Sequence, residues 1–256
     1  MVRTRYAGLT PIRQDAVLRD WSRALLAILR VEVRCYNAPE SLPERCLLVA
    51  NHVSWLDIFA VYAAAPGLFV AKSEIRHWPV VGGLVRRVGT LFIERGSRRH
   101  ARRTNERIVA ALENGRLVAV CPEGTTTDGR SLRHFHAALL QPAIDARALV
   151  LPVALRFVDG AGAQTDAPIY VGEMSLVESV WRIASTPSMA VELRFAPYVN
   201  AEGHHRRDLT RRVHGLMTRA LGLELPHAPP GRVDGQLPGP IPGIPHCPHP
   251  ASADPG

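Results

Sequence analysis

The sequence is poor in cysteine and has no long hydrophobic run. Its four cysteines have neither the spacing of a metal site nor that of a disulfide framework, and they stand far apart at Cys35, Cys46, Cys121 and Cys247. The longest apolar stretch near the N-terminus, Ala24 to Leu29, is too short to span a bilayer. The segment before it has no apolar core of a secretory signal peptide. We therefore expect a cytoplasmic setting, no metal site and no membrane-spanning segment.

Positive charge exceeds negative charge, with 31 lysines and arginines against 23 aspartates and glutamates. A net charge of +8 suits an anionic partner, which could be nucleic acid, a phospholipid surface or a phosphorylated substrate. The most basic segment, residues 95–107, lacks interleaved aromatic residues, and no nucleic-acid motif is present. We therefore expect an anionic membrane surface or an anionic substrate, and no nucleic acid.

Short apolar runs alternate with helical patterns through most of the 256 residues. Strands are expected at residues 46–51, 67–72, 90–94, 117–121, 149–157, 168–172 and 190–195, and helices at 57–64, 80–88, 98–113, 135–146 and 208–221. The early runs are continuously hydrophobic, which is typical of strands buried on both faces of a parallel sheet. The sequence therefore predicts an α/β fold, a single domain with a mostly parallel central sheet flanked by helices.

Both ends of the chain differ from this pattern. Residues from Pro11 to about Arg34 predict an amphipathic helix with flanking arginines, which either packs on the domain or docks on an anionic membrane. From residue 225 onward the chain is rich in proline and glycine, which indicates a disordered tail. We expect three segments: an N-terminal helix at 1–35, the main domain at 36–224 and the tail at 225–256.

A histidine and an aspartate follow the first buried strand, in the stretch NHVSWLD. Within one regular helix His52 and Asp57 would lie about 140° apart around the axis, so they meet only if His52 lies in the turn before the helix. A carboxylate bound to one ring nitrogen orients an imidazole, and the other nitrogen can then take a proton from an alcohol. The pair is a candidate catalytic base, or else a histidine and a helix-capping aspartate that are merely neighbours.

Two further blocks carry polar residues at expected strand ends. In GTLFIERG, Glu94 and Arg95 end a strand, and the arginine could bind a phosphate or carboxylate or form a surface salt bridge. In VCPEGTTTDG, residues 123–125 form a turn whose N–H groups and hydroxyls could hold an anionic oxygen, or a polar loop. Both blocks are therefore candidates for binding an anionic group.

Two apolar blocks complete the set. LPVAL places Pro152 inside a hydrophobic run, which suggests an edge strand or a bulge. Lys72 ends a strand before an apolar, turn-rich segment that could line a groove for an acyl chain.

In this order and at these separations, NHVSWLD, GTLFIER, PEGT and LPVAL resemble the 1-acylglycerol-3-phosphate O-acyltransferases, the phospholipid/glycerol acyltransferases of membrane lipid synthesis. The likeness covers about Arg45 to Leu155. It implies transfer of a fatty acyl group from acyl-CoA or acyl carrier protein to the free hydroxyl of a lysolipid, without a metal or further cofactor. The implied acceptor is 1-acylglycerol-3-phosphate and the implied product is phosphatidate. Because such an acceptor lies in a bilayer, we expect a peripheral enzyme on the cytoplasmic face of the inner membrane, docked through the N-terminal helix and the basic residues 95–107.

The resemblance also implies a role for each matching residue. His52 would be the catalytic base and Asp57 its partner. Acceptor binding would fall to Glu94, Arg95, Glu123, Gly124 and Thr125. Acyl-donor binding would fall to Pro152, and we add Lys72 to that group.

One departure from the family pattern concerns the acceptor. Thr126 stands where relatives usually carry an arginine, and this brings the block closer to enzymes that acylate lyso-ornithine lipid. Lyso-ornithine lipid is therefore the alternative acceptor. More remote alternatives are an acyl-thioester hydrolase, in which water replaces the acceptor, and an inactive lipid-binding protein, against which the retained His52 and Asp57 argue.

Overall fold

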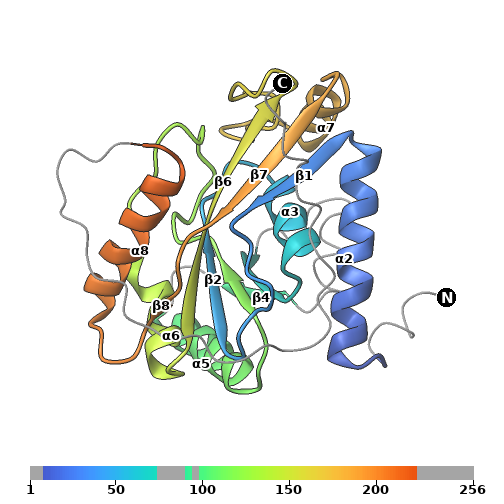
Figure 1. Ribbon diagram of the computed structural model, residues 1–256. Coiled ribbons are helices and arrows are strands. Elements are labelled where there is room, and N and C mark those ends of the chain that lie inside the picture. Colours follow the sequence, from blue (N-terminus) through green and yellow to red (C-terminus); the bar gives the residue numbers. More distant parts are fainter. Residues whose placement is uncertain (1–7, 74–89, 94–97, 224–256) are drawn as a thin grey trace.

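The computed structural model describes residues 8–73, 90–93 and 98–223 (Figure 1). The helix expected at 80–88, the candidate residues Glu94 and Arg95, and the tail expected at 225–256 lie outside these residues.

The strands form a sheet with the order β1-β7-β6-β2-β5-β3-β4, and β8 pairs with β6. Their bounds are β1 Val31–Tyr36, β2 Cys46–Ala50, β3 Leu68–Lys72, β4 Leu91–Ile93, β5 Val118–Val120, β6 Leu149–Asp159, β7 Met189–Phe195 and β8 Val199–Asn200. Among the described strands, five pairings are parallel, and only β6 with β7 and β6 with β8 are antiparallel. The predicted mostly parallel sheet is confirmed.

Helices cover both faces of this sheet (Figure 1). One face packs against α2 Pro11–Ile28, α3 Leu56–Ala64 and α7 Leu176–Ala184. The other packs against α5 Arg98–Glu113, α6 Gln141–Asp145 and α8 Arg206–Ala220. Residues of β2 alternate between the two cores: Leu48 belongs to the first and Leu47 to the second. Because both faces are covered, the strand reads as a continuous apolar run.

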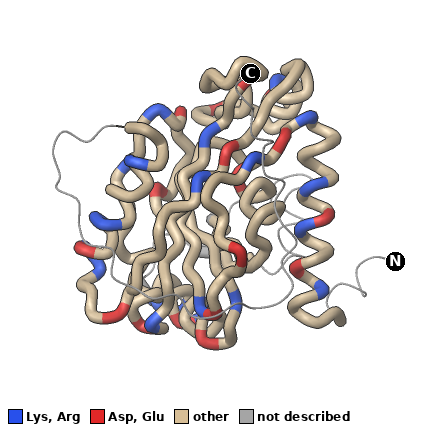
Figure 2. Tube along the Cα trace, viewed as in Figure 1, with Lys and Arg blue, Asp and Glu red and all other residues tan. Residues whose placement is uncertain are grey.

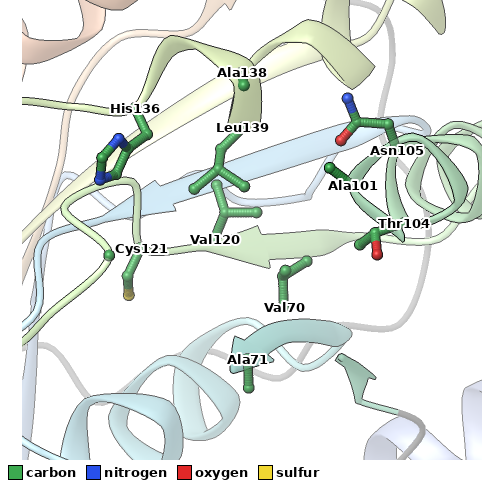
Figure 3. Close-up of a pocket in the computed structure, with 11 residues that line it drawn as sticks. Val70, Ala71, Ala101, Thr104, Asn105, Val120, Cys121, His136, Ala138 and Leu139 are labelled. Atoms are coloured by element: carbon green, nitrogen blue, oxygen red, sulfur yellow. The ribbon is translucent and has the colours of Figure 1, made fainter. Parts of the chain in front are cut away.

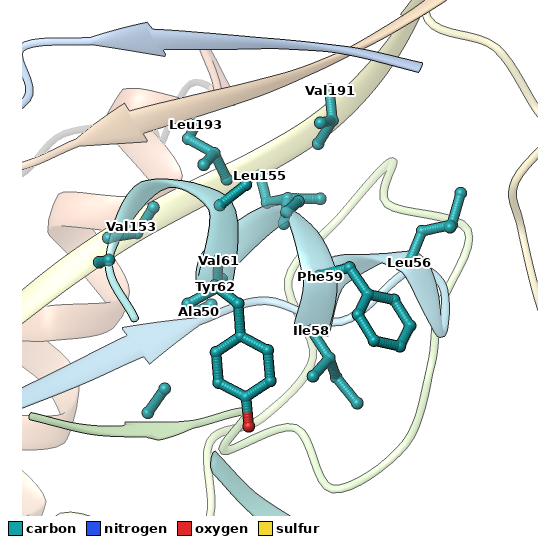
Figure 4. Packing of buried hydrophobic residues seen from close by; sticks show 14 of the residues in the cluster. Ala50, Leu56, Ile58, Phe59, Val61, Tyr62, Val153, Leu155, Val191 and Leu193 are labelled. Atoms are coloured by element: carbon teal, nitrogen blue, oxygen red, sulfur yellow. The ribbon is translucent and has the colours of Figure 1, made fainter. Parts of the chain in front are cut away.

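Helix α3 carries the residues that attach the candidate catalytic block to the sheet. Ile58, Phe59 and Tyr62 are buried on it. They belong to one cluster of buried residues with Leu155 of β6 and Leu193 of β7 (Figure 4). Burial of such side chains contributes about 1.5–3 kcal/mol each, so the start of α3 is held firmly.

Two predictions about secondary structure are wrong. The N-terminal helix ends at Ile28 instead of near Arg34, and the expected segment boundary at residue 35 falls inside β1. Arg30 has a φ of 56°, which ends the helix, and the next residues pair with β7 along the edge of the sheet. Residues 168–172 form no strand; the Tyr170 N–H donates instead to the carbonyl of Val53, 3.1 Å away.

Three other elements also differ from expectation. The helix expected at 135–146 is divided into the 3₁₀ turn η2 Ala137–Leu139 and α6, whose first turn contains Pro142. Proline is tolerated there because the first N–H groups of a helix have no intrahelical partner. Helix α7 and the two-residue strand β8 were not predicted.

Pro152 lies on a central strand, so the prediction of an edge strand is wrong. It stands opposite Val49 of β2, at the place where the antiparallel partner of β6 changes from β8 to β7. There its carbonyl accepts a hydrogen bond from the Ala196 N–H at 2.9 Å. This gap between two partners accommodates a residue that has no N–H to donate.

Candidate active site

His52 and Asp57 meet at the junction between β2 and α3. The turn after Ala50 carries His52, and Asp57 lies in the first turn of α3. The distance between His52 Nδ1 and Asp57 Oδ2 is 2.8 Å. The expectation that the histidine precedes the helix and the aspartate reaches back to it is therefore confirmed.

The Asp57 carboxylate is fully buried and fixed by main-chain groups. Its Oδ2 also accepts from the N–H of Val53 at 2.7 Å and from the N–H of Ser54 at 2.9 Å. An ionised carboxylate can only accept, so Nδ1 of His52 carries the ring proton. Nε2 therefore keeps its lone pair available to a substrate hydroxyl. The His52 side chain is 18% exposed, which lets a substrate reach it.

The main chain of His52 contacts the loop after β5. Glu123 accepts from the His52 N–H through Oε1 at 2.9 Å and from the Arg133 N–H through Oε2 at 3.0 Å. Burial raises the pKa of the Glu123 carboxyl, and its two main-chain hydrogen bonds act against this rise. Thr127 donates to the His52 carbonyl from both its N–H, at 2.8 Å, and its hydroxyl, at 3.2 Å.

The other residues of this loop shape the turn. Gly124 has a φ of 68°, and its N–H donates to the Cys121 carbonyl at 3.2 Å, a conformation that favours glycine. Thr125 is half-buried in the same turn. The hydroxyl of Thr126 donates to the carbonyl of Tyr170, so the residue at the family's arginine position holds the 168–172 segment against the loop.

Two residues in the site were not singled out by the sequence. Thr127 lies in the block VCPEGTTTDG beyond the predicted turn at 123–125, and its contact with His52 depends on two strands ending side by side. Asn51 extends the pairing of β2 with β6: its amide donates to the Leu155 carbonyl at 2.8 Å and its side-chain oxygen accepts from the Leu155 N–H at 2.7 Å. Its place immediately before His52, at the end of a buried strand, was the one signal available.

The remaining candidates lie on the same sheet. Pro152 is buried in β6 beside β2, and Lys72 is the last residue of β3. Their assignment to donor binding, like that of Gly124 and Thr125 to acceptor binding, stays a prediction.

A cavity of about 580 Å³ lies beside the loop after β5 (Figure 3). Its walls come from the ends of β3 and β5, from α5, and from the segment around η2. The side chains of Val70, Val120 and Leu139 make it largely apolar, and Cys121 and Gly124 connect it to the turn that carries Glu123.

The comparisons with known proteins agree with this geometry. The model of the Acyltransferase family matches residues 32–156. A 1-acyl-sn-glycerol-3-phosphate acyltransferase of Neisseria meningitidis is 39% identical over 194 residues, 76% of each chain. One of Neisseria gonorrhoeae is 44% identical over 195 residues, 76% of this chain and 75% of the relative. A lyso-ornithine lipid O-acyltransferase of Pseudomonas aeruginosa is 37% identical over 215 residues, 84% of this chain and 81% of the relative.

A solved structure shares the fold. The 1-acyl-sn-glycerophosphate acyltransferase PlsC of Thermotoga maritima superposes with a TM-score of 0.64 at 22% identity, and the match covers 85% of this chain and 84% of that one. The fold, the family match and the identity to the Neisseria enzymes lead to one assignment. The chain belongs to the acyltransferase family and is an O-acyltransferase.

Proposed function

We propose that this acyltransferase moves a fatty acyl group from a thioester donor, acyl-CoA or acyl carrier protein, to the hydroxyl of 1-acylglycerol-3-phosphate, giving phosphatidate. The observation that carries the proposal is the 2.8 Å contact between His52 and Asp57 in a chain that is 39–44% identical to the Neisseria 1-acyl-sn-glycerol-3-phosphate acyltransferases. A base oriented in this way suits an alcohol as the nucleophile.

The reaction moves one proton from the acceptor hydroxyl to His52 and then from His52 to the leaving group. Nε2 of His52 takes the proton of the acceptor hydroxyl as the oxygen attacks the thioester carbonyl, and Asp57 stabilises the resulting imidazolium. The C–S bond then breaks as the tetrahedral intermediate collapses. The departing thiolate accepts that proton from the imidazolium, so the products are an ester and a free thiol. The thioester is already activated, so the chemistry calls for no cofactor beyond the donor itself.

The alternative acceptor is lyso-ornithine lipid. Thr126 replaces the arginine that could pair with a phosphate, and its hydroxyl is engaged with the carbonyl of Tyr170. The Pseudomonas relative named for this acceptor is 37% identical over 84% of this chain. These observations favour lyso-ornithine lipid over any other second candidate.

An acceptor panel tests the proposal. Purified protein is incubated with one labelled acyl-CoA and, separately, with 1-acylglycerol-3-phosphate, lyso-ornithine lipid, lysophosphatidylcholine or no acceptor. We expect labelled phosphatidate and free thiol with 1-acylglycerol-3-phosphate. Transfer to lyso-ornithine lipid alone would establish the alternative. Equal thiol release without any acceptor would identify a hydrolase.

We also propose that α2 docks the enzyme on an anionic membrane as a peripheral protein. Leu18 and Leu26 bury one face of α2 against the domain, while Val17, Trp21 and Ile28 are exposed on another. Figure 2 shows basic residues recurring along this helix, interspersed with acidic ones. Within the described ranges, no helix has the length and apolar character to cross a bilayer. An exposed apolar stripe with flanking arginines supports docking at a lipid surface.

A further inference from the structure

Both carboxylate oxygens of Glu123 are bonded to the protein's own main chain. They accept from the N–H of His52 at 2.9 Å and from the N–H of Arg133 at 3.0 Å, and the residue is only 4% exposed. The resemblance to the family assigned Glu123 to acceptor binding. A carboxylate beside a phosphate head group would repel it, whereas a carboxylate between two N–H donors is well matched.

The carbonyl of His52 is held from the same loop. Thr127 donates to it from its N–H at 2.8 Å and from its hydroxyl at 3.2 Å. Both main-chain polar groups of His52 are therefore bonded to residues 123–127, and its ring is bonded to Asp57. Rotation or displacement of the imidazole would break at least one of these contacts.

The loop that makes these contacts is itself anchored. Strand β5, which leads into it, pairs in parallel with β2, so both strands end at the same edge of the sheet. The His136 N–H donates to the Pro122 carbonyl at 2.9 Å, and the Gly129 N–H donates to the Thr127 hydroxyl at 3.2 Å. These bonds fix the positions from which Glu123 and Thr127 reach His52.

We propose that Glu123 and Thr127 are positioning residues, which hold the main chain of His52 so that Nε2 faces the acceptor hydroxyl, and that Glu123 does not bind the acceptor head group. The inference rests on the proposed role of His52 as the catalytic base. Its physical basis is that a displacement of the base by about 1 Å lowers the rate by roughly 100-fold.

Glu123→Gln tests the first contact. Glutamine has the same size, but its side chain offers one acceptor oxygen and one NH2 group, which would face a main-chain N–H. We expect kcat to fall roughly 10- to 100-fold while the acceptor KM stays within about twofold. Glu113→Gln, at the exposed end of α5, is the matched control and should retain both constants. A raised acceptor KM with an unchanged kcat would overturn the proposal, since it would mean that Glu123 binds the acceptor.

Thr127 provides a second test that does not depend on whether Glu123→Gln folds. Thr127→Val removes the hydroxyl and keeps the shape, whereas Thr127→Ser keeps the hydroxyl. Valine loses the hydroxyl's hydrogen bonds to the His52 carbonyl and to the Gly129 N–H. We expect kcat to fall by roughly 3- to 10-fold in the valine variant and to recover in the serine variant. Circular dichroism checks that each variant is folded. A valine variant with full kcat, or a loss that serine does not restore, would overturn the role of Thr127.

His52→Ala, measured beside these variants, separates the two proposals. If that variant keeps full activity, the base assignment fails and the positioning role fails with it. If it is inactive while Glu123→Gln keeps its kcat, only the positioning role is overturned.

Discussion

At the scale of single residues, the proposed chemistry depends on one ring nitrogen, Nε2 of His52. Oδ2 of Asp57 accepts hydrogen bonds from three N–H groups, and one of these belongs to the His52 ring. The tautomer is fixed by that contact, which leaves Nε2 as the basic atom. The two residues are five positions apart in sequence. In one regular helix their side chains would point in different directions, so they meet only because His52 lies in the turn before α3.

The first residue-scale prediction concerns this pair. His52→Ala should lower kcat by about 10²–10⁴-fold, the usual contribution of a general base. Asp57→Asn should also lower kcat, because an uncharged amide cannot stabilise the imidazolium. Thiol release from acyl-CoA in the presence of the lysolipid measures both. His134→Ala, an exposed histidine of the loop after β5, is the control and should be fully active. A His52→Ala variant as active as the wild type would refute the mechanism.

At the scale of elements, the contact between two strands places the loop after β5 beside His52. Strands β2 and β5 pair in parallel, with Leu47 opposite Val118, so the loops that follow them emerge together. The carboxyl ends of parallel strands are where α/β folds place their sites, because the connecting helices leave room there. The Glu123 contact with His52 follows directly from this pairing.

Strand pairing also creates an ionic cluster of β6 and β7 around the buried Glu192. Arg156 stands opposite Glu192, whose carboxylate accepts from Arg156 at 2.8 Å and from Arg194 at 2.9 Å. Burial raises the pKa of Glu192, but the hydrogen bonds and charges of the two arginines outweigh burial, and the pKa lies below its ordinary value of 4.5. A carboxyl whose pKa is lowered by folding stabilises the protein above its unfolded pKa.

The prediction at the scale of elements follows from the lowered pKa of Glu192. Glu192→Gln should lower the free energy of unfolding by about 1–3 kcal/mol at neutral pH, as for hydrogen bonds to charged groups. The difference in free energy of unfolding between the variant and the wild type should narrow as the pH falls below 4.5, because protonation of Glu192 removes its stabilising contribution in the wild type. Urea unfolding at several pH values measures it. Glu106→Gln breaks an exposed ion pair with Arg102 and should cost under about 1 kcal/mol. A difference in free energy of unfolding that is constant with pH would contradict the stabilising role of the ionised Glu192.

At the scale of the whole molecule, the proposed docking on a membrane would combine the net charge of +8 with the exposed apolar face of α2. Each basic residue near an anionic membrane contributes about 1 kcal/mol, and salt screens this attraction. Trp21 and Ile28, 40% and 78% exposed, would add an apolar contribution that salt does not screen. The lysolipid acceptor of the proposed reaction is itself a membrane component, so a lipid surface is where the enzyme would meet it.

Vesicle pelleting tests this docking. We expect more protein to pellet with anionic than with zwitterionic vesicles, and less as the salt concentration rises. A double variant, Trp21→Ser with Ile28→Ser, should weaken binding by about tenfold. Val177→Ser with Trp181→Ser is the matched control, since these residues of α7 are also exposed. An equal loss in the control pair would contradict the assignment to α2, and binding indifferent to both lipid charge and salt would exclude electrostatic docking.

The sequence by itself determined the fold class, the bounds of α5 and the contact expected between His52 and Asp57. Strands buried in a parallel sheet appear in the sequence as continuous apolar runs, and a helix with one exposed face appears as a periodic apolar pattern. Each pattern reflects the burial of that segment alone, so it can be recognised without knowing which segments pair. The blocks around His52 and Asp57 indicated the family for the same reason, because they are short local patterns, and the proposed chemistry requires both side chains at that spacing.

Only the tertiary structure decided which segments pair. Residues 31–36 became a strand because β7 lies beside them, and Pro152 is tolerated in a central strand because its partner changes at that residue. Glu123 and His52 are 71 residues apart, and no local pattern records a hydrogen bond between them. Contacts of this kind depend on the packing of the whole sheet, whereas periodicity reports only the surroundings of one segment.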